Sequence, residues 1–256
     1  MAVKTTGSLS LDNDIRGEFG GSAPHSLSEY KRGGSYVPNG PTQNNNIPTS
    51  NSDIRFSDYY GAIAWVPGNQ TFTGTQAWTP PAGTNSSTVF TVTLVAGGGG
   101  GGGGEGNGGG GGGGYQSQSV TGLSGSAITV TIGGGGSGGL GDSFYGGWYP
   151  GTNGGSTSFG SHLSASGGTA GTHIHLGSSG GVGGSPGGGA GQNNYGNGCG
   201  GTGGSSQGGQ GAGGSRGCGA GATGGGGGAY GGGGGGGGWS YGRAGNGHAG
   251  RVYVSW

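Results

Sequence analysis

Apolar and polar residues alternate in four stretches of the chain, and each alternation predicts a β-strand. Phe90, Val92 and Leu94 fall on one face of such a strand, while Thr91 and Thr93 fall on the other. The four stretches are residues 71–78, 88–96, 127–132 and 251–256. Because an isolated strand leaves its backbone amides unpaired, the last stretch must pair with strands far earlier in the sequence. We therefore expect a small β-module that encloses the residues between these strands.

Residues 1–66 carry a different pattern, which predicts short helices separated by turns. Ser26, with Glu29 three residues later, forms a capping box at the start of one helix. Similar start and stop signals bound two further helices, at residues 10–20 and 51–61. Helices this short are not stable alone, so they must pack on another surface. We therefore expect an attachment region that docks on another protein or on its own copies.

Glycine is the main building material of residues 67–256, which we expect to form one domain. The whole chain has 85 glycines in 256 residues, with tracts at 97–104 and 108–114. Collagen is excluded, because it needs glycine at every third position together with abundant proline. A disordered linker and an ordered bundle of extended helices both accept this composition. We favour the bundle, because the two tracts match in length and glycine backbones can approach closely enough to bond to one another.

The predicted fold class is mainly β and polyglycine-II. A small β-module encloses a bundle of glycine-rich extended helices, and short α-helices lie in the attachment region. The glycine tracts alternate, without a fixed period, with segments rich in aromatic and polar residues. On such a frame these segments would form exposed variable loops, whereas Tyr230, between two glycine tracts, is more typical of the frame itself.

Aromatic residues between the tracts are the candidate binding residues. Tyr and Trp suit a binding surface because they bring a large contact area at low entropic cost. Alternatively, any one of these aromatic residues could simply cap the bundle or pack against it. The candidates are Phe144, Tyr145, Trp148, Tyr149, Tyr195, Trp239 and Tyr241.

Charge is sparse, and its distribution excludes several classes of protein. The chain has 8 Lys and Arg, 8 Asp and Glu, and a formal net charge of zero. No basic cluster is present of the kind that phosphate recognition in nucleic acids needs. No run of about 18 apolar residues predicts a membrane span. Residues 1–30 lack the apolar centre of a signal peptide, so we expect synthesis in a cytoplasm without a secretion signal.

Neither catalysis nor a cofactor is predicted. The first glycine tract can be matched to the GxGxxG motif, but no helix pattern follows it, so a dinucleotide site is not expected. Glu105, Asp142 and the histidines lie in different segments. The acidic residues are too few to indicate the carboxylate pair of a glycosidase. We therefore expect a protein that is not an enzyme and holds no cofactor.

Two pairs of residues have a possible chemistry that the sequence leaves open. His173 and His175 would lie on one side of an extended chain and, in a three-fold fibre, could offer six imidazoles to a metal ion. An isolated His-x-His is a weak metal signal, so solvent-facing or receptor-contacting histidines are favoured. Cys199 and Cys218 allow one disulfide, but two free thiols in loops are the simpler interpretation.

Two parts of the chain resemble proteins of tailed bacteriophages. Residues 6–62, with GSLSLDNDIRGEFGGSAPHSLSEYKRGGSYVPNG and IPTSNSDIRFSDYYGA, resemble the N-terminal region of many tail-fibre and tail-tip proteins. Residues 70–256, with ITVTIGGGG, STSFGSHLSASGG and the final GRVYVSW, resemble the glycine-rich domain often found behind it. Distal adhesins of T-even-type phages are similar in using polyglycine-II helices, although the N-terminus of this chain departs from theirs.

The resemblance implies a virion protein of the distal tail or tail fibre that binds the host cell. Its partners would be a surface glycan or an outer-membrane protein, and other tail or baseplate proteins through residues 1–66. Fibres of this kind are commonly trimeric, which favours a homotrimer. A purely structural tail or baseplate component without receptor contact is the alternative. An ice-binding or wall protein is disfavoured by the irregular aromatic segments and by the expected lack of a signal peptide.

Overall fold

The computed structural model shows a chain that is mainly β, with two antiparallel sheets. Among the residues that it describes, the only α-helix is the single turn α1 (Arg16–Phe19). The described residues are 2–23, 25–39, 42–51, 53–64, 68–81, 84, 86, 88–104, 107–123, 125–141, 149–172, 180–192, 200–206, 213–214, 216–218, 222–237 and 242–256.

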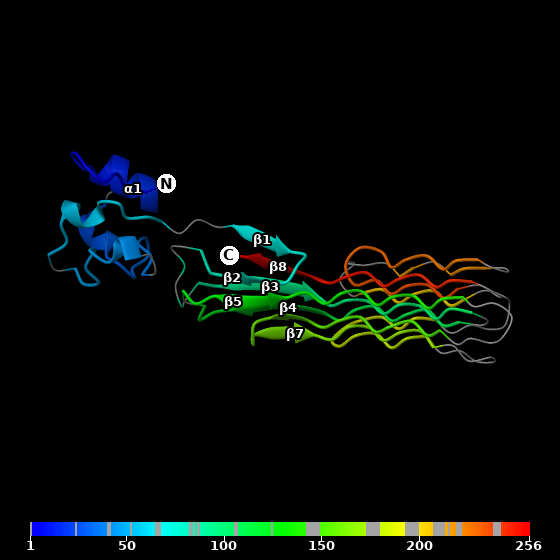
Figure 1. Cartoon of the computed structure of the whole chain (residues 1–256). Helices are drawn as coiled ribbons and strands as arrows, with labels where there is room; N and C mark the ends of the chain where they lie inside the picture. The colour runs from blue at the N-terminus through cyan, green and yellow to red at the C-terminus, as the bar shows by residue number, and fades with distance from the viewer. Residues whose placement is uncertain are drawn as a thin grey trace.

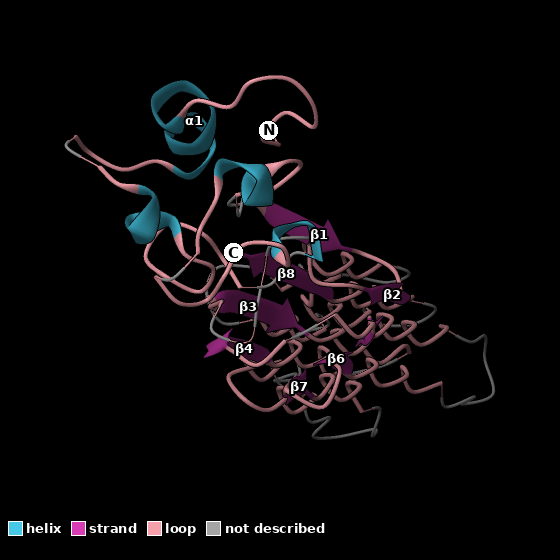
Figure 2. Ribbon diagram, turned by 90° about the vertical axis from the view of Figure 1, so that its left-hand side faces the viewer, coloured by secondary structure: helices cyan, strands magenta, loops and turns pink. Residues whose placement is uncertain are grey.

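The two sheets have four strands each and form a sandwich. The first sheet runs in the order β1 (Asn69–Phe72), β8 (Arg251–Ser255), β3 (Phe90–Val95) and β4 (Tyr115–Val120). The second runs in the order β2 (Gln76–Trp78), β5 (Ile128–Thr131), β6 (Thr157–Phe159) and β7 (Leu163–Ala165). Strand β8 lies between β1 and β3 and is antiparallel to both (Figure 2), so the predicted pairing of the last stretch with far earlier strands is confirmed.

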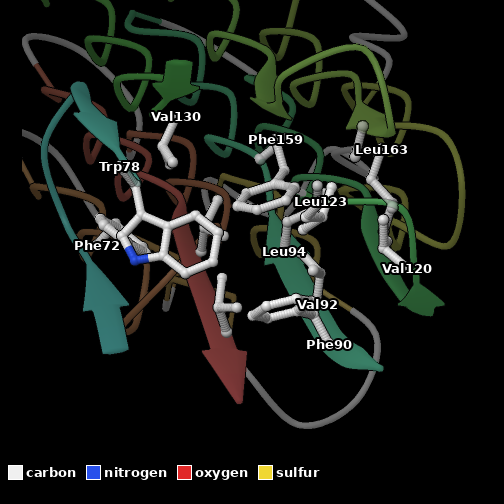
Figure 3. Close-up of a cluster of buried hydrophobic side chains, with 14 residues drawn as sticks. Phe72, Trp78, Phe90, Val92, Leu94, Val120, Leu123, Val130, Phe159 and Leu163 are labelled. Atoms are coloured by element: carbon white, nitrogen blue, oxygen red, sulfur yellow. The ribbon is translucent and has the colours of Figure 1, made fainter. Parts of the chain in front are cut away.

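One hydrophobic core fills the space between the sheets. Phe90, Val92 and Leu94 of β3 are fully buried, whereas the threonines between them are exposed or half-buried, as the alternation predicts. The ring centroid of Trp78 lies 5.6 Å from that of Phe90 and 5.5 Å from that of Phe159. Figure 3 shows these side chains pointing toward one another from the strands of both sheets. Burial of aromatic side chains of this size dominates the energetics of a core.

The strands depart from the predicted pattern in three places, one of which is the pair of short strands β6 and β7, which the sequence did not predict. Residues 71–78 read as one alternating stretch, but the structure divides them between β1 and β2, which belong to different sheets. Strand β4 follows the tract 108–114 directly and has the polar sequence YQSQSV. No alternation of apolar residues marks β4, because as an edge strand it is held mainly by its backbone pairing with β3.

Residues 2–64 have a hydrophobic cluster of their own. Ile15, Tyr30, Val37, Ile47 and Tyr59 are fully buried in it. The hydroxyl of Tyr59 donates to the carbonyl oxygen of Tyr30 over 2.9 Å, and burial raises the pKa of both phenols. Apart from α1, the helical elements are single turns at Leu11–Ile15, Leu27–Tyr30, Thr42–Asn44 and Phe56–Tyr59. In Figure 1 these residues form a unit set apart from the sandwich.

Single turns of 3-10 or π-helix mostly replace the α-helices expected in this region. Ser10 accepts a hydrogen bond from the backbone as an N-cap should. The capping box at Ser26 is wrong, because its hydroxyl lies 2.6 Å from that of Ser28 and makes no bond to the helix backbone. The helix predicted at residues 51–61 is a single turn that begins at Phe56, later than predicted. Turns this short take their form from packing on the cluster more than from local capping.

The glycine-rich segments extend from one end of the sandwich as a set of chains running side by side (Figure 1). The sandwich holds the near ends of these chains and does not surround them, which corrects the expectation of an enclosing β-module. The described parts of these segments therefore extend away from the sheets for most of their length.

Candidate functional site

The tract 97–104 is bonded to its neighbours with a repeat of three residues. The amide of Gly97 donates to Gly155, and the amide of Gly100 donates to Thr152, both over 3.0 Å. The amides between them donate in two other directions. In all, the three series of amides reach segments 149–155, 242–248 and 108–111. The carbonyl oxygens of the same tract accept from three more segments, which are 136–139, 168–171 and 234–237.

Three glycine tracts occupy the centre of the bundle. Besides 97–104, residues 107–114 and 231–237 also exchange backbone hydrogen bonds with neighbours on six sides. Every residue of these three tracts is buried. The hydrogen bonds offset the large conformational entropy that ordered glycine loses, a cost that side-chain burial cannot offset here.

Apart from Asn107 at the start of one tract, these central tracts have room only for glycine. A Cβ atom added at Gly100 would overlap the carbonyl oxygen of Ser137, and one added at Gly110 would overlap that of Gly99. Similar overlaps with backbone atoms occur at almost every described glycine of the three tracts. Backbone atoms cannot move aside as a flexible side chain can, so any side chain here would separate the segments.

The outer segments follow a different rule, in which one residue in three faces inward. In segment 133–141, Gly133, Gly136 and Gly139 are buried, whereas Ser137 and Leu140 are exposed. The same alternation recurs in segments 166–172, 180–185 and 242–247. The outward positions carry the side chains, which explains local triplets such as GGSGGL, SGGTAGT and GGVGGS.

Polar side chains at outward positions bond to amides that face the surface. The hydroxyl of Thr152 accepts from the amide of Ser137 over 2.7 Å, and the side-chain oxygen of Asn246 accepts from the amide of Gly138 over 2.7 Å. The hydroxyl of Thr169 accepts from the amide of Val182 over 2.6 Å. These side chains complete the hydrogen bonding of the frame where no further segment covers it.

Contacts of Tyr230 with Arg251 and His248 hold the near end of the bundle. Tyr230 lies under the guanidinium of Arg251, whose central carbon is 4.1 Å from the ring centroid. The amide of Tyr230 donates to the ring nitrogen Nδ1 of His248 over 3.0 Å. These contacts bring Tyr230 against the start of β8, in line with its predicted place in the frame.

Of the predicted binding residues, Tyr149 is described, and its side chain is 43% exposed. Its carbonyl oxygen accepts from the amide of Gly103, at the far end of the tract 97–104. The other six predicted residues lie outside the described part of the chain. They are Phe144, Tyr145, Trp148, Tyr195, Trp239 and Tyr241.

The described residues on either side of these segments are all at the far end of the bundle. Tyr149, which follows 142–148, is bonded to Gly103 as described above, and Gly242, which follows 238–241, accepts from Gly104. Gln192, which precedes 193–199, accepts from Gly109. The frame therefore brings the chain to one end each time it enters or leaves an aromatic segment.

Two exposed residues near Tyr149 were not among the predicted site residues. Leu140 is 52% exposed, and Arg243 is exposed on a neighbouring segment. Sequence reasoning concentrated on aromatic residues and on the segments between long glycine tracts. The signal that would have found both is the triplet pattern, because each occupies an outward position in a run of paired or single glycines.

The cysteine and histidine hypotheses have different outcomes. Cys218 is disulfide-bonded, so the prediction of free thiols is wrong; Cys199, the second of the two cysteines, lies outside the described residues. His173 and His175 also lie outside them, and metal binding there stays a prediction. Within the described ranges, no group of three or more His, Cys, Asp or Glu side chains is placed to hold a metal ion.

Neither membrane-spanning character nor similarity to known proteins indicates a role for this chain. In the part of the chain that the structure describes, no helix has the length and apolar character to cross a membrane. No family model matches the chain, and no curated protein sequence matches it. What the chain does must therefore be inferred from its own residues and geometry.

Proposed function

We propose that this protein is a tail-fibre or tail-tip component of a tailed bacteriophage and that it binds a structure on the host cell surface. One observation carries the proposal: the described residues that flank the aromatic segments lie together at the end of the bundle away from the sandwich. A chain used only as a spacer has no need to gather its aromatic segments at one end. The resemblance of residues 6–62 and 70–256 to phage tail proteins supports the virion context.

The glycine-rich segments are, in this proposal, polyglycine-II helices. A helix of this type has three residues per turn and points its amides and carbonyls outward. The three-residue repeat of the hydrogen bonds from Gly97 onward supports that geometry. At about 3.1 Å per residue, a tract of eight glycines is a rod of roughly 25 Å.

Binding then depends on rigid presentation and on multiple copies. A frame whose central amides are bonded on six sides fixes the described residues that flank the aromatic segments before the receptor arrives, which reduces the entropy lost on binding. Several copies on one virion add avidity without any new contact. Residues 1–66 attach the protein to the tail or to its own copies, and a homotrimer is the favoured assembly.

The experiment is a binding assay on whole cells. The purified, labelled protein is exposed to a panel of candidate bacteria, and competition with phage attachment is measured alongside. The test variant changes Phe144, Tyr145, Trp148 and Tyr149 to Ala. The matched control is Phe56→Ala, because Phe56 is an exposed aromatic residue, 41% accessible, in the N-terminal unit.

We expect strain-selective binding that blocks phage attachment, is lost in the fourfold variant and is retained by Phe56→Ala. Circular dichroism establishes that each variant is folded. Absence of binding to every strain by the folded wild type would contradict the proposal and favour a purely structural tail or baseplate component.

A further inference from the structure

The outward positions of the bundle are polar with few exceptions. Along the outer segments they carry Ser, Thr, Asn or Arg, and several of these side chains bond to surface amides. Leu140 and Val182 break this rule, and they are 52% and 67% exposed. Single exposed apolar residues are common on protein surfaces and need no explanation. Leu140 differs from Val182 because an exposed tyrosine and an exposed arginine lie on the two segments beside it.

The hydrogen-bond register places Tyr149 opposite Leu140. The amide of Thr152 donates to the carbonyl of Ser137, and the amide of Gly155 donates to that of Gly134, both over 2.8 Å. Moving three residues further along both segments brings Tyr149 level with Leu140. Because residues three apart share a face in a three-residue repeat, both side chains lie on the same side as Ser137 and Thr152.

The same reasoning places Arg243 on the other side of Leu140. The amide of Gly247 donates to Gly136 and the amide of Ala244 donates to Gly139, over 2.8 and 3.0 Å. This register brings Arg243 level with Leu140, just as it brings Asn246 level with Ser137. The contact between the side-chain oxygen of Asn246 and segment 133–141 is observed directly, at the amide of Gly138.

Two rows of side chains therefore cross three neighbouring segments. The lower row is Thr152, Ser137 and Asn246, and its polar groups bond to the frame itself. The upper row, nearer the far end, is Tyr149, Leu140 and Arg243, all exposed. Asp142, the acidic residue closest in sequence, lies outside the described residues.

We infer that Tyr149, Leu140 and Arg243 form one contact site for a host protein, which presents an apolar side chain to Tyr149 and Leu140 and a carboxylate to Arg243. This inference rests on the proposed function. Tyr and Arg are the residue types most enriched at the energetic centres of protein interfaces. Leu140 offers no hydrogen-bonding group to the hydroxyls of a glycan. An apolar protein side chain needs no such group there.

The test uses single substitutions in the full chain, each with a matched control on another segment. Leu140→Ser introduces the residue that already occupies the equivalent outward position at 137, so the frame is retained. Its control is Val182→Ser, because Val182 is another exposed aliphatic residue of the bundle. Arg243→Gln is matched by Arg216→Gln, because Arg216 is exposed on a different segment. Each variant is titrated by flow cytometry against cells of a strain that the wild-type protein binds.

We expect Leu140→Ser and Arg243→Gln each to weaken binding about ten-fold or more, the scale of an interface anchor, while both controls bind as the wild type does. The loss from Arg243→Gln shrinks at high salt, because screening weakens the charge pair that it removes. Treating the cells with proteinase K abolishes binding, and periodate oxidation of their glycans leaves it intact.

Three results would overturn the inference. Normal binding by Leu140→Ser and Arg243→Gln would place the contact elsewhere, and the proposed adhesive function would stand. Binding that survives proteinase K and is lost after periodate would identify a glycan ligand instead. Failure of the wild type to bind any strain would remove the proposed function and this inference together.

Discussion

The amide of Gly99 donates a hydrogen bond to the carbonyl oxygen of Gly111 over 2.8 Å, so the tracts 97–104 and 108–114 lie directly against each other. A Cβ on either tract would collide with backbone atoms of a neighbour. The glycines therefore act as structural residues whose lack of a side chain permits the contact.

The inward and outward positions of one outer segment respond differently to the same substitution. A Cβ at Gly133 would overlap the carbonyl oxygen of Gly155, whereas a Cβ at Gly134 would meet no atom within 4 Å. We expect Gly133→Ala to lower the free energy of unfolding by about 1–3 kcal/mol or more, as overpacking does, and Gly134→Ala to leave it within about 0.5 kcal/mol. Thermal unfolding followed by circular dichroism compares the two. Equal melting temperatures would contradict the packing described for this segment.

The hydroxyl of Thr157 is one of the links between the bundle and the sandwich. Thr157, at the start of β6, is fully buried, and its hydroxyl accepts from the buried amide of Gly133 over 3.0 Å. Thr157→Val keeps the shape and leaves that amide unpaired, so it should cost about 1–3 kcal/mol. Thr157→Ser keeps the acceptor and serves as the control, with a smaller loss. Urea denaturation measures both, and a Val variant as stable as the wild type would show that the bond contributes nothing.

The N-terminal unit should lose stability in acid. A hydrogen bond from Arg16 lowers the pKa of Asp12, and one from the amide of Ser10 lowers the pKa of Asp14, below the ordinary value of 3.8. A carboxyl with a lower pKa in the folded state stabilises the fold above its unfolded pKa, and this contribution is lost as the pH falls through the folded pKa. We expect constant stability from about pH 7 to 5 and a decrease between about pH 4 and 2.

The variant Asp12→Asn with Asp14→Asn isolates this effect in urea denaturation of the full chain. It should be less stable than the wild type at pH 7 and should show a smaller decrease in acid. A decrease of the same size in both proteins would assign the acid sensitivity to other groups.

Strand prediction succeeded for the stretches with a clear alternation, missed the three-residue strands β6 and β7, and failed where backbone bonds alone suffice. Phe90, Val92 and Leu94 had to face a core, and their spacing shows it. Strand β4 pairs through its backbone and has one buried residue, Val120, so its side chains carry little signal. The capping box at Ser26 failed because packing of the buried Tyr30 sets a tighter turn than the capping residues favour.

The sequence predicted the type of residue at the candidate site but not the full set of residues. Aromatic segments between glycine tracts pointed to the far end of a frame, and Tyr149 is exposed there. Leu140 and Arg243 were missed because their proximity to Tyr149 depends on the register of three segments that are distant in sequence. The three-residue period occurs only in short, separate runs such as GGSGGL and GGVGGS, so it produces no single period along the whole chain.

Amide hydrogen exchange of the glycine tracts tests the central claim most directly. If 97–104 and 108–114 are bonded on six sides, their amides should exchange as slowly as those of β3, because backbone hydrogen bonds hold both and β3 leads directly into the tract 97–104. The segment-resolved exchange of the full chain, measured by mass spectrometry, gives the comparison. Slow exchange in both tracts is the predicted result. Exchange at the rate of an unstructured chain, beside a protected β3, would show that the glycines are a tether and would contradict the account.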